Sequence, residues 1–235
     1  MSKNTAATGT GLYPLDNKVA PPVNYSMVLY PGFQALDAFG PLDVLNSLAS
    51  TENINLFILA PTLEPVSTTP LPRPGLTWNK GSCSQSVVPT HTYDNLPESI
   101  DVLLVPGGTG NRDDRIREPV SKLIHDLYPK LKYLFTICTG SKLPAHVGIL
   151  DGRNATSNKL ALKETISLYP KVNWIGRARW VVDGNIWTSS GVTAGMDGLL
   201  ALVEHIYDAQ KADNIAYYLE YAREKDSSND PFYEE

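Results

Sequence analysis

Short apolar runs that each stop abruptly at a turn residue constrain the fold of this chain more than any other feature. Residues 25–30 (YSMVLY) stop at Pro31, residues 101–105 (DVLLV) stop at Pro106, and residues 133–137 (YLFTI) stop at Cys138. Such runs, bounded by turn residues, are typical of buried strands in a parallel sheet. The 18 prolines, which exceed the 17 glycines, exclude a long helical bundle because proline breaks helix interiors.

Segments with apolar residues at helical spacing alternate with these strands. The pattern predicts helices at residues 35–49, 115–128, 142–149, 158–168 and from about Ala194 to Tyr221, and further strands at 54–60 and near 172–174, 179–182 and 185–189. Residues 61–95, rich in proline, threonine and serine, should hold short strands or a hairpin and no helix. The alternation predicts a doubly wound α/β/α sandwich with a mostly parallel central sheet. We expect one domain over residues 25–222, between an N-terminal tail (1–24) and an acidic C-terminal tail (223–235).

Composition narrows the class of protein. The chain has 235 residues, of which 42% are hydrophobic and only 19% charged, and its net charge is −5. A nucleic-acid binder needs a basic surface, so we expect no nucleic-acid partner. No apolar run is long enough to span a bilayer, and no signal peptide is evident, so we expect no membrane association. Two cysteines without a disulfide framework fit a reducing compartment. The predicted location is the cytoplasm, with the nucleus as a second compartment.

Cys138 is the sharpest candidate for chemistry. A buried strand runs directly into it, and a helix follows at once, as in a cysteine version of the nucleophile elbow. Such a turn exposes the side chain above the sheet, and the start of the helix favours the thiolate. The alternative is a buried structural cysteine. Ligands of such sheets bind outside the carboxyl ends of the strands, where the loops after Tyr30, Val105 and Ile137 meet.

Two further loops carry candidate residues. Asp37, just after the first strand, is positioned to cap its helix, or else to approach Cys138 and donate a proton to an intermediate. Gly107 and Gly108 follow a strand with unobstructed backbone N–H groups, which suit either an oxyanion pocket or a tight turn. Neither a phosphate-binding loop nor a dinucleotide fingerprint is present, because the glycine spacing does not fit.

The last candidate loop is GVTAG at residues 191–195, where Gly191 and Val192 allow close approach of a substrate, or simply cap a helix. His146 and His205 lie within predicted helices away from Cys138, so a Cys-His-acid triad is poorly supported. No His or Cys cluster has the spacing of metal ligands, so the sequence predicts no metal and no cofactor.

Six ordered motifs together resemble the DJ-1/PfpI superfamily over residues 25–222. They are YPGFQALDAFGP at 30–41, VPGGTG at 105–110, ICTGS at 137–141, GILDGR at 148–153, RWVVDGN at 179–185 and SGVTAGMD at 190–197. Within the superfamily the sequence looks most like the isocyanide-hydratase branch and its fungal members. The resemblance implies a flavodoxin-like sandwich, of the class I glutamine amidotransferase-like kind, that forms a homodimer.

The same resemblance implies roles for individual residues. Cys138 is the nucleophile, Asp37 is the acid that contacts it, and Thr139 adds a polar contact, while Gly107 and Gly108 match the backbone N–H pocket. If the activity carries over, the Cys138 thiolate attacks the terminal carbon of a small isocyanide, and water then releases an N-substituted formamide.

Departures from the family pattern concern the substrate more than the nucleophile. Where many relatives have Thr-Thr-His-Trp, residues 156–159 read TSNK, and Asp43 stands where many carry glutamate. Two alternatives stay open. One is a glyoxalase or deglycase acting on α-oxoaldehydes, although that branch usually pairs Cys-His with a glutamate. The other is a non-enzymatic thiol stress sensor or chaperone, whose Cys138 oxidises readily to a sulfinic acid.

Overall fold

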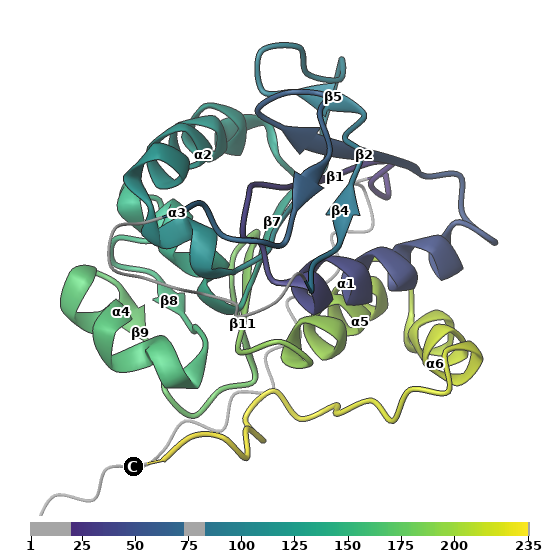
Figure 1. The fold of residues 1–235 in the computed structure, drawn as a ribbon. Helices are drawn as coiled ribbons and strands as arrows, with labels where there is room; N and C mark the ends of the chain where they lie inside the picture. Colours follow the sequence, from purple (N-terminus) through teal and green to yellow (C-terminus); the bar gives the residue numbers. More distant parts are fainter. Residues whose placement is uncertain (1–19, 73–82, 235) are drawn as a thin grey trace, which may run out of the picture.

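A single mixed sheet forms the centre of the molecule (Figure 1). The computed structural model describes residues 20–72 and 83–234. The strands of the sheet are β1 (Asn24–Val28), β2 (Asn55–Ala60), β5 (His91–Thr92), β6 (Val102–Val105), β7 (Tyr133–Ile137), β10 (Trp180–Asp183) and β11 (Ile186–Ser189). Their spatial order within the described ranges is β10-β11-β7-β6-β1-β2-β5. Only the β10–β11 pair is antiparallel, so the predicted, mostly parallel sheet is confirmed.

The strand order reverses at β1. The chain passes from β1 to β2 on one side and then crosses to β6 and β7 on the other. In doubly wound sheets such a reversal opens a crevice outside the carboxyl ends of the neighbouring strands. The loops that follow β1, β6 and β7 all emerge at this edge, because the three strands are parallel and adjacent.

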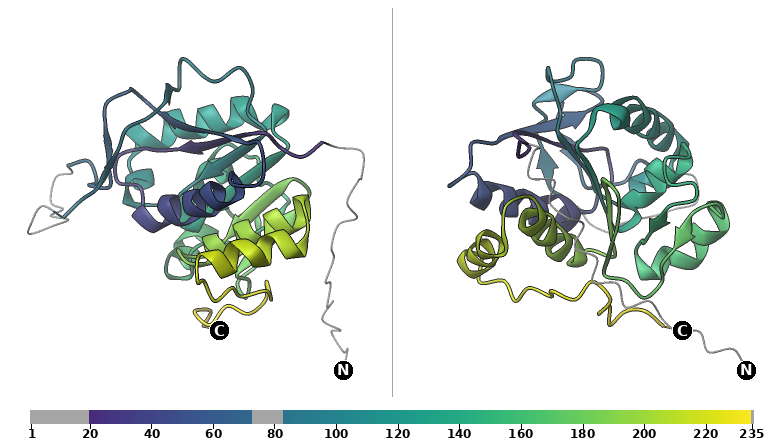
Figure 2. Two further views of the ribbon diagram at one scale, coloured as in Figure 1. Left: turned by 90° about the vertical axis from the view of Figure 1, so that its right-hand side faces the viewer. Right: turned by 180° about the vertical axis from the view of Figure 1, so that it is seen from behind.

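Helices cover both faces of the sheet, as Figure 2 shows in two further views. The α-helices are α1 (Ala35–Leu48), α2 (Asp114–Leu127), α3 (Lys142–His146), α4 (Leu162–Leu168), α5 (Ala194–Ile206) and α6 (Ala209–Tyr218). Short 3-10 turns are η1 (Thr109–Arg112), η2 (Tyr128–Lys130), η3 (Cys138–Ser141) and η4 (Lys159–Ala161). Helices α1, α5 and α6 pack on one another, and α2 packs on α3. The predicted doubly wound α/β/α sandwich is therefore confirmed.

Two small sheets lie outside the main one. They pair β3 (Val66–Ser67) with β4 (Ser86–Val87) and β8 (Asn154–Ala155) with β9 (Asn173–Trp174). The first pair and β5 confirm that the described parts of residues 61–95 form short strands; residues 73–82 lie outside the described ranges.

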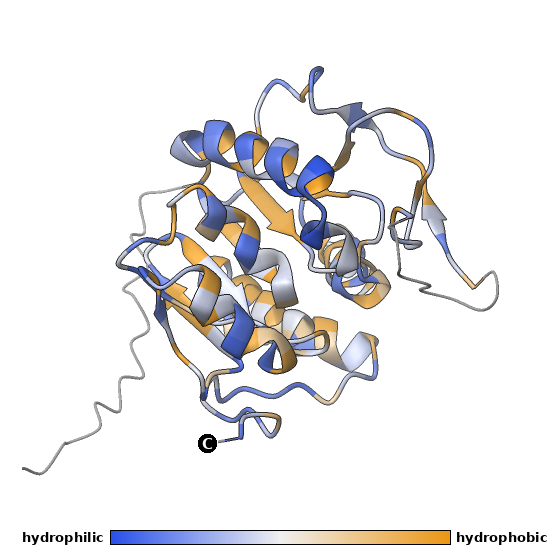
Figure 3. Cartoon of the chain, turned by 60° about the vertical axis from the view of Figure 1, so that its left-hand side comes forward, coloured by the Kyte–Doolittle hydropathy of each residue, from blue (hydrophilic) through white to orange (hydrophobic). Residues whose placement is uncertain are grey.

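Hydrophobic side chains fill the space between the sheet and the helices. Figure 3 shows hydrophobic colour along the central strands and hydrophilic colour on the outer helical turns. All four residues of β6 and all four of β11 are buried. No helix in the described ranges is long and apolar enough to cross a membrane.

The long helix predicted from Ala194 to Tyr221 is interrupted in the structure. Helix α5 ends at Ile206, where Tyr207 leaves helical geometry with φ −112° and ψ −85°. Asp208 then caps α6, its carboxylate accepting a hydrogen bond from Lys211 N. An aspartate N-cap inside an apolar helical pattern favours a new helix start, because its side chain satisfies a free backbone N–H.

The C-terminal segment, residues 222–234, folds back along the domain (Figure 1). Arg179 N donates to Ser227 O, and Glu224 N donates to the buried carboxylate of Asp197. Asp230 is itself buried. The acidic sequence that predicts a solvated tail therefore includes residues that bind the folded domain.

Replacing Leu104 tests the core. Its side chain is fully buried in β6, so Leu104→Ala should lower the free energy of unfolding by about 2–5 kcal/mol through lost burial and a residual cavity. Leu63→Ala, at a side chain 57% exposed, is the matched control and should change it by less than about 0.5 kcal/mol. Urea unfolding followed by circular dichroism measures both, and equal losses in the two variants would contradict this core.

Candidate active site

Cys138 lies at the carboxyl end of β7 on a strained turn. Its φ is +58°, in the left-handed region that costs a non-glycine residue about 1–3 kcal/mol. The surrounding backbone holds the turn: Cys138 N donates to Ser190 O, and Cys138 O accepts from the hydroxyls of Ser141 and Ser157 at 3.3 and 3.2 Å. The cysteine is 7% exposed. The predicted strand–cysteine–helix elbow is present, and these hydrogen bonds hold its backbone in the strained conformation.

Three hydrogen-bond donors face the Cys138 sulfur. They are the backbone N–H groups of Thr139 and Val192 and the side chain of Asn158, and each lowers the pKa of the thiol. Burial has the larger effect and, with the nearby charge of Asp37, raises the pKa of the Cys138 thiol to about 12. Since donors stabilise a thiolate more than a thiol, these three contacts offset part of the cost of placing a negative charge on the buried sulfur.

Asp37 supplies the carboxyl group beside the sulfur. It sits in the first turn of α1 and is fully buried; its Oδ2 accepts from Gly107 N at 2.9 Å. Burial raises the pKa of Asp37 to about 7, against the hydrogen bonds from Gly107 and Cys138, which lower it. Two adjacent anions are disfavoured, so the carboxyl and the thiol share one proton near neutral pH. The predicted approach of Asp37 to Cys138 is thus observed, and the simple capping alternative does not describe it.

Gly107 and Gly108 lie beside this pair, but their N–H groups are already engaged. Gly107 N donates to Asp37, and Gly108 N donates to Thr139 Oγ1 at 3.1 Å. Of the two predicted roles, an oxyanion pocket or a tight turn, neither includes this one: both N–H groups position side chains. A Cβ at Gly107 would lie 2.7 Å from Thr139 N and 2.9 Å from Asp37 Oδ2, so only glycine fits.

Asn111 is a site residue that the sequence interpretation missed. It is buried in η1, and its Nδ2 donates to Thr139 O at 2.9 Å and to Thr139 Oγ1 at 3.1 Å. It thereby fixes the threonine whose N–H faces the sulfur. Its signal was weak, because an asparagine directly after a glycine loop is read as a turn residue.

Gly191 and Val192 lie in the loop between β11 and α5, and the Val192 N–H faces the Cys138 sulfur. A Cβ at Gly191 would clash with the Asn158 amide, and Val192 holds the uncommon φ of +20°. Together with Asn158, Thr193 and Phe232 they line a pocket of about 330 Å³. A larger pocket of about 520 Å³ lies between α1 and α6; it is lined by Asp43 and contains none of the predicted site residues.

The four histidines take other roles. His146 hydrogen-bonds to Glu118, His125 to Asp126 and His91 to Thr90, while His205 packs against Tyr133 and Trp187. These placements agree with the expectation that no histidine pairs with Cys138. Among residues 20–72 and 83–234, no group of three His, Cys, Asp or Glu side chains is arranged to hold a metal ion.

Comparison with known proteins decides the family. The model of the DJ-1/PfpI family matches residues 25–205. This chain belongs to the DJ-1/PfpI family. Isonitrile hydratase of Pseudomonas putida is 30% identical over 197 residues, which are 83% of this chain and 77% of that protein. A deglycase of Pyrococcus horikoshii is 32% identical over 117 residues, 49% of this chain and 68% of the relative.

Solved structures agree with the fold. A ThiJ/PfpI family protein of Pseudomonas syringae superposes with a TM-score of 0.68 at 25% identity, covering 94% of this chain and 83% of the other. Drosophila melanogaster DJ-1beta gives a TM-score of 0.67 at 20% identity, covering 85% and 98% of the two chains. The flavodoxin-like sandwich expected from the sequence motifs is therefore confirmed for this DJ-1/PfpI protein.

Ionisation of Asp37 should make this protein less stable as pH rises. The carboxyl has a pKa near 4 in the unfolded chain and about 7 when folded, so the folded state binds more protons between these values. The free energy of unfolding should fall from pH 5 to pH 8 by on the order of 1 kcal/mol or more relative to Asp37→Asn, which cannot ionise. Urea unfolding at the two pH values measures this, and parallel pH dependence in parent and variant would contradict it.

Proposed function

We propose that the protein is a cysteine-dependent hydratase that converts small isocyanides to N-substituted formamides. The observation that carries the proposal is the buried Cys138–Asp37 pair, with three donors facing the sulfur. Similarity to isonitrile hydratase across 83% of the chain supports the same reaction. The pocket next to Asn158 and Val192 has apolar walls from Val192, Leu160 and Phe232, which suit the apolar group of a small substrate, and Lys159 also lines it.

The first step forms a covalent intermediate. The Cys138 thiolate attacks the terminal carbon of the isocyanide, and a carbon–sulfur bond forms. The Asp37 carboxyl gives its proton to that carbon, which leaves a neutral thioimidate on the sulfur and a carboxylate at Asp37. A pKa of about 7 suits this transfer, because near neutral pH the Asp37 carboxylate can take the proton of the Cys138 thiol, which forms the thiolate, and then give that proton to the carbon.

The second step consumes water. Its oxygen adds to the thioimidate carbon, and the substrate nitrogen receives one of its protons. The other proton passes to the Asp37 carboxylate as the carbon–sulfur bond breaks and the thiolate leaves. The product is the N-substituted formamide, and both residues return to their starting protonation. The donors at Thr139, Val192 and Asn158 stabilise the departing thiolate.

Removing either member of the pair should abolish turnover. Cys138→Ala should lower formamide formation at least about a thousandfold because the nucleophile is lost. Asp37→Asn should lower it about 10²–10⁴-fold because proton transfer is lost. The control is Cys83→Ser, at an exposed cysteine, which should keep full activity. Chromatographic detection of the formamide provides the assay, and turnover surviving in Cys138→Ala would refute the proposal.

A glyoxalase or deglycase activity is the second candidate, favoured by the 32% identity to the Pyrococcus deglycase over about half of this chain. The same cysteine would then attack the carbonyl of an α-oxoaldehyde. That branch usually has a histidine directly after the nucleophile, where this chain has Thr139. This difference weighs against the second activity, since no histidine side chain of this chain takes that place at Cys138.

Parallel assays with an isocyanide and with methylglyoxal separate the two reactions. We expect isocyanide to be consumed with a kcat/KM at least about tenfold above that for methylglyoxal, because none of the four histidine side chains is placed to act as a base at Cys138. The reverse ranking would assign the protein to the second reaction. Homodimer formation and the cytoplasmic location stay predictions.

A further inference from the structure

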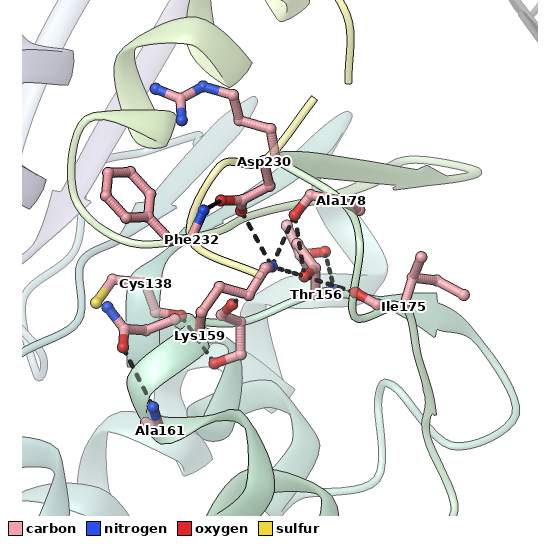
Figure 4. Close-up of polar contacts among 12 residues, drawn as sticks. Cys138, Thr156, Lys159, Ala161, Ile175, Ala178, Asp230 and Phe232 are labelled. Atoms are coloured by element: carbon pink, nitrogen blue, oxygen red, sulfur yellow. Dashed lines mark hydrogen bonds and ion pairs between the residues drawn. The ribbon is translucent and has the colours of Figure 1, made fainter. Parts of the chain in front are cut away.

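The C-terminal segment reaches the active site through one buried ion pair. Lys159 Nζ lies 3.3 Å from Asp230 Oδ2, and the two side chains are 6% and 1% exposed. Figure 4 shows this contact with Cys138 and Phe232 in the same cluster. The desolvation cost of a buried ion pair can exceed its Coulombic stabilisation. The Lys159–Asp230 pair is therefore better explained by the positions it fixes than by a contribution to stability.

Lys159 is held by more than the carboxylate. Its ammonium group donates to Ala178 O at 2.7 Å, Thr156 Oγ1 at 2.9 Å and Ser157 O at 3.3 Å (Figure 4). Burial lowers the pKa of Lys159, while Asp230 opposes that shift and the charge of Arg179 adds to it. The Lys159 ammonium thus connects the segment around Asn158 to the backbone at Ala178, which precedes β10.

Asn158 is the residue that this clamp holds in place. Its Oδ1 accepts from Ala161 N at 3.3 Å, which caps the turn leading into α4. The amide nitrogen then faces the opposite way, against Gly191, where a Cβ would lie 2.3 Å from it, and the Asn158 side chain lowers the pKa of the Cys138 thiol. The orientation follows from the cap, because the oxygen is committed to Ala161 and only the nitrogen remains for the sulfur.

Asp230 also shapes the pocket directly. Its second oxygen, Oδ1, accepts from Phe232 N at 3.0 Å, and Phe232 lines the 330 Å³ pocket with Asn158 and Val192. The Asp230 carboxylate thereby fixes the position of Lys159, next to Asn158, and of Phe232, which forms one wall of the pocket.

We propose that Asn158 is a catalytic residue that donates a hydrogen bond to the Cys138 sulfur. Lys159 and Asp230 are positioning residues that hold Asn158 in this orientation. Through Asp230, the C-terminal segment contributes to the geometry of the active site. The proposal rests on the reactive role of Cys138 in the proposed function but not on the identity of the substrate. An amide donor keeps its proton at every physiological pH, so its effect on the thiolate is constant.

The test is the pH dependence of Cys138 alkylation by iodoacetamide, measured by peptide mass spectrometry in a Cys83→Ser background. The titratable groups that face Cys138 are Asp37 from α1 and Tyr30 after β1, and both stay unchanged in every variant. The thiolate is the reacting form, so the curve reports its stability without any substrate. Failure of isocyanide turnover would leave this measurement intact.

Asn158→Ala should move the curve about one unit toward higher pH, a roughly tenfold lower rate at any pH below its midpoint. Asn158→Asp keeps the acceptor for Ala161 N and hence the helix cap, and should move the curve at least as far, because a carboxylate replaces the donor. Curves that superimpose on the parent in both variants would overturn the role of Asn158.

Asp230→Asn should shift the curve in the same direction by a smaller amount, and Asp230→Glu, which restores the charge, should recover most of the parent rate. Glu234→Gln, which removes an exposed charge from the same segment, is the matched control and should leave the curve in place. Circular dichroism confirms that each variant is folded. A parent-like curve for Asp230→Asn, or an equal shift in Glu234→Gln, would overturn the positioning role.

Discussion

The contact between a buried thiol and a buried carboxyl group organises the active end of this molecule. Cys138 and Asp37 come from β7 and α1, and they meet only because β1, β6 and β7 are adjacent and parallel. Neither group is solvated, so both resist ionisation, and together they hold one proton near neutral pH. The N–H groups of Gly107, Thr139 and Val192 compensate the lost water by pointing at one partner or the other. The strained φ at Cys138 persists because the surrounding hydrogen bonds stabilise this backbone conformation.

Much of the fold could be predicted because the strands end where an apolar run gives way to turn residues. The apolar runs before Pro106 and Cys138 became β6 and β7 with nearly the expected bounds. The division of the last helix was missed, since residues 206–209 contain neither proline nor glycine and the break depends on the Asp208 cap. In the same way, the acidic composition of the C-terminal segment predicts exposure, and only the three-dimensional fold reveals that Asp230 meets a buried lysine.

The active site divides along similar lines. Cys138 directly follows β7, and Asp37 lies in the first turn of α1, the helix that follows β1, so local sequence and sheet topology suffice to bring them together. Asn111 and Asn158 act through long-range contacts that no spacing rule encodes. The sequence around Gly107 and Gly108 suits either an oxyanion pocket or a tight turn, and in the structure their N–H groups hold Asp37 and Thr139. The TSNK sequence at 156–159 places an amide at the sulfur and a buried ammonium beside it. In this DJ-1/PfpI protein the proposed nucleophile, Cys138, therefore lies among contacts that come from distant parts of the sequence.

Rapid-quench peptide mass spectrometry during a single turnover of an aryl isocyanide tests the central claim most directly. The account predicts a transient adduct on Cys138 with the mass of one whole isocyanide, appearing before the formamide and decaying as the formamide forms. Cys83, exposed and away from the pocket, should carry none. Formamide production with Cys138 unmodified throughout, at quench times shorter than one turnover, would contradict covalent catalysis by this residue.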